Sequence, residues 1–191
     1  MNKIERALIF AAEAHSGQTR KNGAPYIFHP SEAAAIAASL TDDEDVLTAV
    51  LLHDTIEDTD VTADDIRVEF GDHVAELVLG ETENSYDEVS RADSWLMRKQ
   101  ESLEHLKMSS RDVKIMWLAD KLSNMRSFTN LFHSEGDRMW EHFNQKDKKV
   151  QEWYYRTIAD CLSELSDSDA YREYKLRLGE IFDEVKYEEN C

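Results

Sequence analysis

The sequence predicts an all-α fold built as one helical bundle. Apolar residues recur at helical spacing along most of the chain, and no segment alternates apolar and polar residues as a strand does. Only 6 Gly and 2 Pro stand among 191 residues, which favours long helices over the many turns of a β sandwich or barrel. This length suits one compact domain with a sizeable core, so we expect residues 1–191 to form a single domain.

The first two helices are expected to flank a loop. Ile4, Leu8, Ala11 and His15 mark one face of the first helix. Residues 18–29 contain an Asn-Gly pair and a proline, which are typical of turns. The second helix is rich in alanine, and Pro30 suits its first position because the amide there has no partner inside the helix.

Cap signals mark the next helices. Thr41 with Glu44 three residues later is a capping-box pattern, which predicts the start of the third helix. Thr62 with Asp65 repeats the pattern more weakly, and Gly71 suits the C-terminal cap of the helix that follows.

The second half of the chain holds the strongest helical patterns. A polar, aperiodic segment over residues 81–90 is expected to be a loop. Ser109 and Ser110 are cap residues between two of the later helices. The periodicity predicts helices over 95–107, 112–128, 137–165 and 169–187.

Composition excludes several classes of function. Lys+Arg 22 against Asp+Glu 40 gives a net charge of −18, which repels phosphate backbones and argues against a nucleic-acid partner. The longest apolar stretch, 46–52, is too short to span a bilayer, and no signal peptide is visible. Cys161 and Cys191 cannot make a disulfide framework. We therefore expect a cytoplasmic protein without a membrane partner.

Metal-ligating residue types gather on otherwise apolar segments. His53 and Asp54 follow an apolar helical run, and an imidazole with a carboxylate at a helix end suits Mn²⁺, Fe²⁺ or Zn²⁺. Glu57 and Asp58 follow one turn later and are placed to orient or deprotonate a water. Taken alone, such an acidic pair is more often a solvated helix end. His29 and the basic pair before it form further candidate segments.

Asp120 is the most informative acidic residue because its helix is otherwise apolar. Burying an unpaired carboxylate is costly, so Asp120 needs a partner. A metal ion is one such partner, and a salt bridge to Lys121 or Arg126 is the structural alternative. Asn124 lies one turn further along the same face.

These segments together resemble the HD-domain metal-dependent phosphohydrolases. The resemblance is closer to the hydrolase domain of RelA/SpoT-type enzymes and to the small stand-alone alarmone hydrolases. It covers about residues 4–130, whereas the C-terminal helices, over about 137–187, match only as generic helices. It rests on His15-Ser16-Gly17-Gln18, Arg20-Lys21-Asn22-Gly23, Pro25-Tyr26-Ile27-Phe28-His29-Pro30, residues 51–59 and Leu118-Ala119-Asp120-Lys121-Leu122-Ser123-Asn124-Met125-Arg126.

The resemblance implies an HD-type helical bundle that holds one divalent ion, with Mn²⁺ the expected ion. Its ligands would be His29, His53, Asp54 and Asp120. Enzymes of this kind remove the 3′-pyrophosphate of guanosine tetra- and pentaphosphate and leave GDP or GTP. The implied partner is therefore a small guanine nucleotide.

The resemblance also implies roles around the ion. Glu57 and Asp58 match the acidic pair that activates the attacking water, and Arg20 matches an arginine that stacks on guanine, which its flat guanidinium suits. The remaining substrate-side positions are Lys21 beside that arginine, Tyr26 packed under the loop, Asn124 near the metal and ribose, and Lys121 and Arg126 as local positive charges.

Some residues depart from the family pattern. Ser123 stands where an aromatic residue or histidine is common, Lys121 where arginine is usual, and Glu81 begins a segment where a Thr-Lys pair is typical. Two alternatives stay open: an HD phosphohydrolase acting on another nucleotide or phosphoester, and a non-catalytic helical protein that senses a nucleotide. Aromatic residues on the C-terminal helices offer a candidate surface for a homo-oligomer.

Overall fold

The computed structural model describes residues 1–21, 23–82, 90 and 93–183. Within these ranges the secondary structure is helical, apart from one isolated bridge between Thr19 and Pro25. The all-α prediction is thereby confirmed. The α-helices are α1 (Lys3–Ala14), α2 (Phe28–Ala37), α3 (Glu44–Leu52), α4 (Thr55–Asp58), α5 (Ala63–Phe70), α6 (Asp72–Glu81), α7 (Trp95–Met108), α8 (Arg111–Glu135), α9 (Lys148–Cys161) and α10 (Asp169–Phe182), with short 3₁₀ helices η1 (Gly136–His142) and η2 (Ser163–Leu165).

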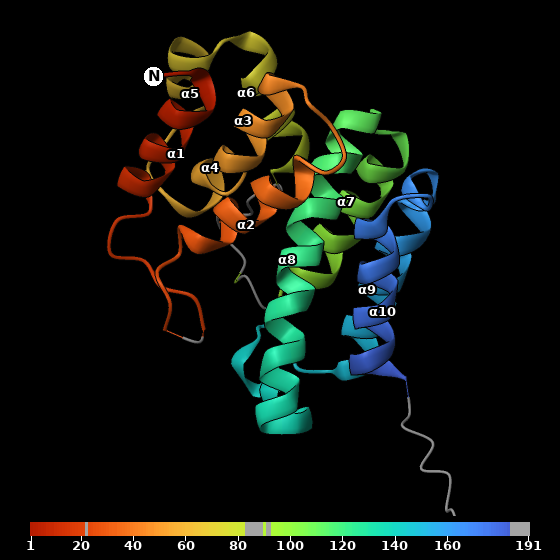
Figure 1. Cartoon of the computed structure of the whole chain (residues 1–191). Coiled ribbons are helices and arrows are strands. Elements are labelled where there is room, and N and C mark those ends of the chain that lie inside the picture. Colours follow the sequence, from red (N-terminus) through yellow and green to blue (C-terminus); the bar gives the residue numbers. More distant parts are fainter. Residues whose placement is uncertain (22, 83–89, 91–92, 184–191) are drawn as a thin grey trace, which may run out of the picture.

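Helix α8 is the axis of the molecule. Figure 1 shows it running down the centre, with α1–α6 on one side and α9 and α10 on the other. Helices α2 and α10 both pack directly against α8. The apolar side chains of α8 explain this position, because Met116, Trp117, Leu118 and Leu122 are almost completely buried. Each such side chain contributes about 1.5–3 kcal/mol through burial.

The caps predicted at Thr62, Gly71, Ser109 and Ser110 are confirmed, and the one predicted at Thr41 is wrong. Thr62 and Asp65 form the capping box of α5, and Gly71 ends that helix with φ of 99°. Helix α3 is capped by Asp43 instead of Thr41, since the Asp43 carboxylate accepts from the amides of the first turn. The Thr41 hydroxyl accepts from the Asp43 amide, which forms a turn before the helix.

Helices α1 and α2 differ in detail from the prediction. In α1 the buried face is made of Ala7 and Ala11, whereas Leu8 is 40% exposed. The small alanines allow close packing against α3. Helix α2 begins at Phe28, so that Pro30 is its third residue; the first turn tolerates proline because its amides lack partners within the helix. This earlier start places His29 inside the helix.

The helix expected over 137–165 is interrupted. Gly136 ends α8 with φ of 60°, a conformation that favours glycine, and η1 follows. Asp147 then caps α9 by accepting from the Lys149 amide. Most of the expected loop 81–90, the end of the expected helix 169–187, and Cys191 lie outside the described residues.

Among the described helices, none combines the length and the apolar composition needed to cross a bilayer.

Candidate metal centre and active site

Two helices and one helix junction bring the four predicted ligands together. His29 comes from the first turn of α2, and Asp120 from the middle of α8. His53 and Asp54 form the junction between α3 and α4. The apolar end of α3 carries this junction into the interior, so that His53 is only 3% exposed although it is polar.

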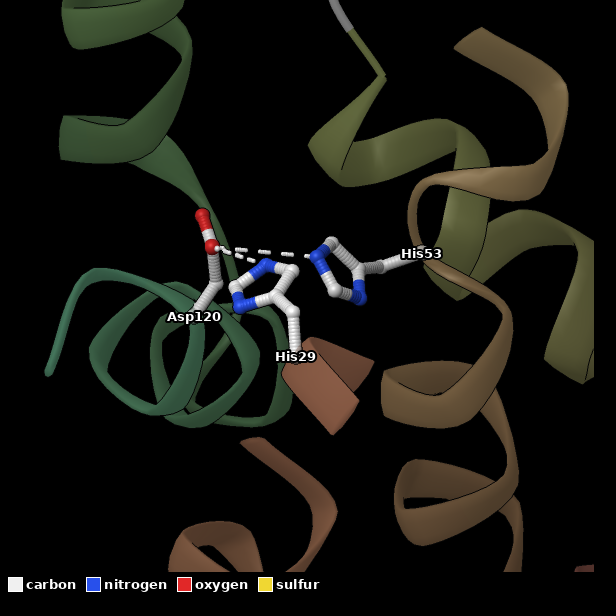
Figure 2. A group of neighbouring side chains, drawn as sticks. All are labelled: His29, His53 and Asp120. Carbon is white, nitrogen blue, oxygen red and sulfur yellow. Dashed lines mark ion pairs between the residues drawn. The ribbon is translucent and has the colours of Figure 1, made fainter. Parts of the chain in front are cut away.

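The ligand atoms face one another across short distances. The Asp120 Oδ1 atom lies 3.1 Å from His29 Nε2 and 3.7 Å from His53 Nε2, and Figure 2 shows both rings pointing at this carboxylate. The Asp54 Oδ2 atom lies 3.1 Å from His53 Nε2 and 3.5 Å from His29 Nε2. One atom from each of His29, His53 and Asp120 falls within 4.8 Å of the others, a spacing that one metal ion can bridge.

The hydrogen bonding of His53 shows that the cluster fits a cation. Its Nδ1 atom lies 2.7 Å from the Val50 carbonyl oxygen, which only accepts, so Nδ1 carries the hydrogen. The buried Nε2 atom makes no hydrogen bond within the described part of the chain. With its hydrogen on Nδ1, the imidazole directs Nε2 toward the Asp54 and Asp120 carboxylates, so that either a proton or a metal ion can lie between them; two such imidazoles with two carboxylates are the donor set of a divalent-ion site.

Opposite charges in the cluster shift its pKa values strongly. Burial lowers the pKa of His53, but the carboxylates of Asp54 and Asp120 outweigh it and raise that pKa well above its ordinary value. Burial likewise raises the pKa of Asp120, yet Lys121 and the two histidines hold it well below the usual range. The carboxylates therefore stay ionised and attract positive charge, either a proton on His53 or a metal ion in its place.

Asp120 has several polar partners besides the histidines. Of the two salt bridges considered from the sequence, Lys121 forms one, whereas Arg126 pairs with Glu32 and Glu173. The Asn124 amide donates to Asp120 Oδ1 at 2.6 Å. Arg126 is therefore not one of the local positive charges at the site, contrary to the prediction.

The acidic pair lies on α4, one turn after the His-Asp junction. Glu57 lines the same cavity as the histidines. The Tyr26 hydroxyl donates to Asp54 Oδ2 at 2.6 Å and lies 3.0 Å from Asp58 Oδ2. Burial and these carboxylates raise the pKa of Tyr26, so it remains a donor. The sequence predicted only that Tyr26 packs under the loop, and it missed this contact because the contact joins two distant segments.

Two adjoining cavities surround these residues. The first, which we call the polar cavity, has a volume of about 170 Å³. It is lined by Arg20, Tyr26, His29, His53, Asp54, Glu57, Glu81, Lys99, Trp117, Asp120, Lys121 and Asn124. The second, which we call the large pocket, has about 500 Å³ and is lined by Thr19, Arg20, Lys21, Tyr26, Asn124, Ser127, Phe128, Asn130, Leu131, Ser134 and Phe143. Arg20, Tyr26 and Asn124 belong to both.

The basic pair predicted to meet the substrate lies at the large pocket. Arg20 donates to Asn124 Oδ1 at 2.9 Å, and its guanidinium carbon lies 5.8 Å from the centre of the Tyr26 ring. The Lys21 ammonium lies 4.0 Å from the centre of the Phe143 ring. Burial, together with Arg20, lowers the pKa of Lys21. The chain thus places cations beside the cluster despite its net charge of −18.

Three residues of the polar cavity were not assigned a role from the sequence: Glu81, Lys99 and Trp117. Glu81 is 8% exposed, and both its carboxylate oxygens lack hydrogen-bond partners among the described residues. Burial raises its pKa to about 8. The sequence signal for Glu81 was its position, as an acidic residue at the end of the apolar face of α6. Nothing in the sequence pattern around Lys99 indicated that its side chain lines the cavity.

Comparison with known proteins places the chain in a family. The family model described as "HD domain" matches residues 7–150. The chain belongs to the HD-domain family. The chain is 36% identical over 133 residues to the bifunctional (p)ppGpp synthase/hydrolase SpoT of Escherichia coli K12. The aligned residues cover 69% of this chain and 19% of that protein. It is 39% identical over 132 residues to the guanosine-3′,5′-bis(diphosphate) 3′-pyrophosphohydrolase of Vibrio cholerae, with 65% and 18% covered. The aligned part of the chain thus spans less than a fifth of the length of these curated relatives.

Two solved structures resemble the HD domain over most of their length. One is of a metazoan orthologue of SpoT, described as hydrolysing ppGpp, with a TM-score of 0.68, 27% identity, and coverage of 95% of this chain and 94% of that chain. The other is a protein from Listeria monocytogenes EGD-e with a TM-score of 0.71 and 33% identity, covering 82% of this chain and 99% of that one. These matches confirm the HD-type helical fold.

Proposed function

We propose that this HD domain is a metal-dependent phosphohydrolase that removes the 3′-pyrophosphate from guanosine tetra- or pentaphosphate and leaves GDP or GTP. The observation that carries the proposal is the convergence of His29, His53 and Asp120 in a polar cavity that opens beside a larger pocket containing Arg20. The activities named for the similar proteins support the same substrate.

In this proposal His29, His53, Asp54 and Asp120 hold one divalent ion. The set of two imidazole nitrogens and two carboxylates suits Mn²⁺ or Fe²⁺ better than Ca²⁺, and Mn²⁺ is the ion we expect. When bound, the ion supplies positive charge and Lewis acidity against the phosphates.

The acidic pair on α4 provides the base. The oxygen of a water attacks the phosphorus attached to the ribose 3′ oxygen, and the Glu57 carboxylate takes the proton that the water loses. The bond from phosphorus to the 3′ oxygen breaks, pyrophosphate is released, and the 3′ oxygen takes up a proton from solvent water to become the hydroxyl of GDP or GTP. Asp58 lies one residue further, beside the Tyr26 hydroxyl. That hydroxyl donates to Asp54, so Tyr26 lies between a proposed metal ligand and the acidic pair.

Cations and the large pocket provide recognition. We assign the guanine base to the large pocket, where the Arg20 guanidinium is placed to stack on it. Lys21, Lys121 and Asn124 complete the substrate side, with Lys21 and Lys121 acting through charge. The partner is accordingly a small nucleotide. We infer that the chain acts in the cytoplasm, as its sequence predicts, and the homo-oligomer and the single domain stay predictions.

The test is a product screen on metal-stripped protein with and without added Mn²⁺. Guanosine tetraphosphate, its adenosine analogue and GMP are compared by ³¹P NMR. We expect pyrophosphate and GDP from guanosine tetraphosphate only when Mn²⁺ is present. Equal turnover of GMP would support the general phosphoesterase instead. Binding of guanosine tetraphosphate without turnover would support the non-catalytic protein that senses a nucleotide.

A further inference from the structure

A chain of hydrogen bonds runs from His29 to the C-terminal helix. The His29 Nδ1 atom lies 2.9 Å from the Ser123 hydroxyl, which donates to Glu32 Oε2 at 2.8 Å. Arg126 Nη1 donates to Glu32 Oε1 at 3.0 Å. Arg126 also donates through Nε and Nη2 to the two carboxylate oxygens of Glu173 on α10, at 2.9 and 2.6 Å.

The direction of these hydrogen bonds fixes the tautomer of His29. A carboxylate only accepts, so the single hydroxyl hydrogen of Ser123 is used on Glu32. The Ser123 oxygen can then only accept from His29, and Nδ1 must carry the hydrogen. Nε2 keeps its lone pair, and that atom is the one that lies 3.1 Å from Asp120 Oδ1.

We propose that Ser123 and Glu32 are positioning residues that hold His29 in the form able to bind a metal ion, and that Arg126 and Glu173 hold Glu32 in place. The inference rests on the proposed function in one respect, namely that His29 is a metal ligand. Outer partners of this kind fix ring orientation and tautomer in metal sites. It also gives α10 a role at the site, although α10 lies beyond the residues that the family model matches.

Glu32→Gln tests the direction of the chain because it keeps the shape of the side chain. Arg126 requires an acceptor, so the amide oxygen of the new glutamine faces Arg126 and its NH₂ group faces Ser123. The amide then donates to the Ser123 oxygen, and the serine hydroxyl donates to His29 Nδ1. This reversal moves the imidazole hydrogen to Nε2, where it blocks metal binding. Glu32 is 40% exposed in its side chain, so we expect the variant to fold.

The experiment measures binding of Mn²⁺ alone by isothermal titration calorimetry. We expect Glu32→Gln and Ser123→Ala to bind Mn²⁺ about 10–100-fold more weakly than the wild type, and Glu173→Gln to show a smaller loss. The ¹⁵N chemical shifts of the metal-free protein report the tautomer, and in Glu32→Gln the hydrogen of His29 should move from Nδ1 to Nε2. Glu152→Gln, which removes a carboxylate from an arginine pair on α9, is the matched control and should bind like the wild type.

Each outcome separates the two proposals. If the wild type binds no Mn²⁺, the proposed function fails at its metal site. If the wild type binds Mn²⁺ while Glu32→Gln keeps both its affinity and the Nδ1–H tautomer of His29, the positioning role is overturned and the metal site stands. Thermal unfolding without metal identifies loss of folding, and a variant that keeps the wild-type melting temperature but loses affinity supports the proposal.

Discussion

The polar cavity and the large pocket adjoin and share three residues, yet the rest of their linings differ. Ionisable side chains surround the cavity of about 170 Å³, and they include the two buried histidines and Asp120. The pocket of about 500 Å³ carries Phe128, Leu131 and Phe143 on its walls. A small charged cavity suits a metal ion and a phosphate, whereas a larger pocket with aromatic and aliphatic walls suits the flat face of a base.

This contrast teaches where each kind of defect should appear. If the proposed function holds, a change in the polar cavity acts on the reacting atoms and should lower kcat. A change in the large pocket acts on a part of the substrate that does not react, and it should raise KM. Arg20 belongs to both, so it is the most informative residue at the boundary.

The largest effect is expected at His53, whose Nε2 atom makes no hydrogen bond to the described residues. His53→Gln keeps a polar side chain in the buried space but removes the imidazole lone pair. We expect bound Mn²⁺ and hydrolysis to be lost together, measured by metal analysis and product release. His73→Gln, at an exposed position of α6, serves as the control. Full activity in His53→Gln would show that hydrolysis does not depend on a metal ion bound by His53.

The next effect separates the acidic pair from the metal ligands. Glu57→Gln keeps the shape and removes the proton acceptor, so kcat should fall by about 10²–10⁴. Mn²⁺ affinity and KM should change much less. Steady-state kinetics and calorimetry measure these quantities, with the exposed Glu76→Gln as the matched variant. Normal turnover in Glu57→Gln would show that the Glu57 carboxylate is not the base and has only a structural role.

Arg20→Lys examines the large pocket while keeping the charge. Loss of stacking on a base costs about 1–3 kcal/mol, which corresponds to a rise in KM of roughly five- to 150-fold. The rise should persist at high salt because stacking is not screened as charge is. Arg6→Lys, at a partly exposed position of α1 that pairs with Glu69 and lines neither cavity, is the control. An unchanged KM for guanosine tetraphosphate would mean that Arg20 acts through charge alone.

The last effect concerns Glu81 and stability. Its pKa rises from 4.5 to about 8 on folding, so the folded protein binds the proton more tightly than the unfolded chain. The free energy of unfolding of the metal-free wild type should therefore fall as pH rises from 4.5 toward 8. Glu81→Gln lacks this loss. Its melting temperature, measured with a chelator present, should gain on the wild type by roughly ten degrees more at pH 8 than at pH 5. One pKa unit is worth about 1.4 kcal/mol, and about 1 kcal/mol shifts the melting temperature by roughly 2–4 °C at this size. If the melting temperatures of the wild type and Glu81→Gln change in parallel with pH, Glu81 does not contribute to the pH dependence of stability.

The sequence predicted the parts of the molecule that depend on local pattern. Periodicity identified α7 and α8, and the Thr62 capping box identified the start of α5. Acidic and histidine residues on apolar faces pointed to His53 and Asp120, which the fold brings together. Their roles as ligands stay predictions until metal is measured.

What the sequence missed depends on how helices pack. The bond between Ser123 and Glu32 joins residues that are far apart in the chain, and it exists because α2 lies against α8 in one register. Lys99 reaches the polar cavity from α7, and no local pattern indicates that packing. The break after α8 depends on a single glycine, which periodicity averages away.

The most direct test of the central claim is anomalous X-ray diffraction from crystals of the wild type grown with Mn²⁺. We expect one ion per chain in the polar cavity, at about 2.0–2.2 Å from His29 Nε2, His53 Nε2 and oxygens of Asp54 and Asp120. Glu57 and Asp58 should lie outside the ligand shell, within reach of a water. An ion bound elsewhere, or an ordered crystal in Mn²⁺ with no anomalous peak among these four residues, would contradict the account.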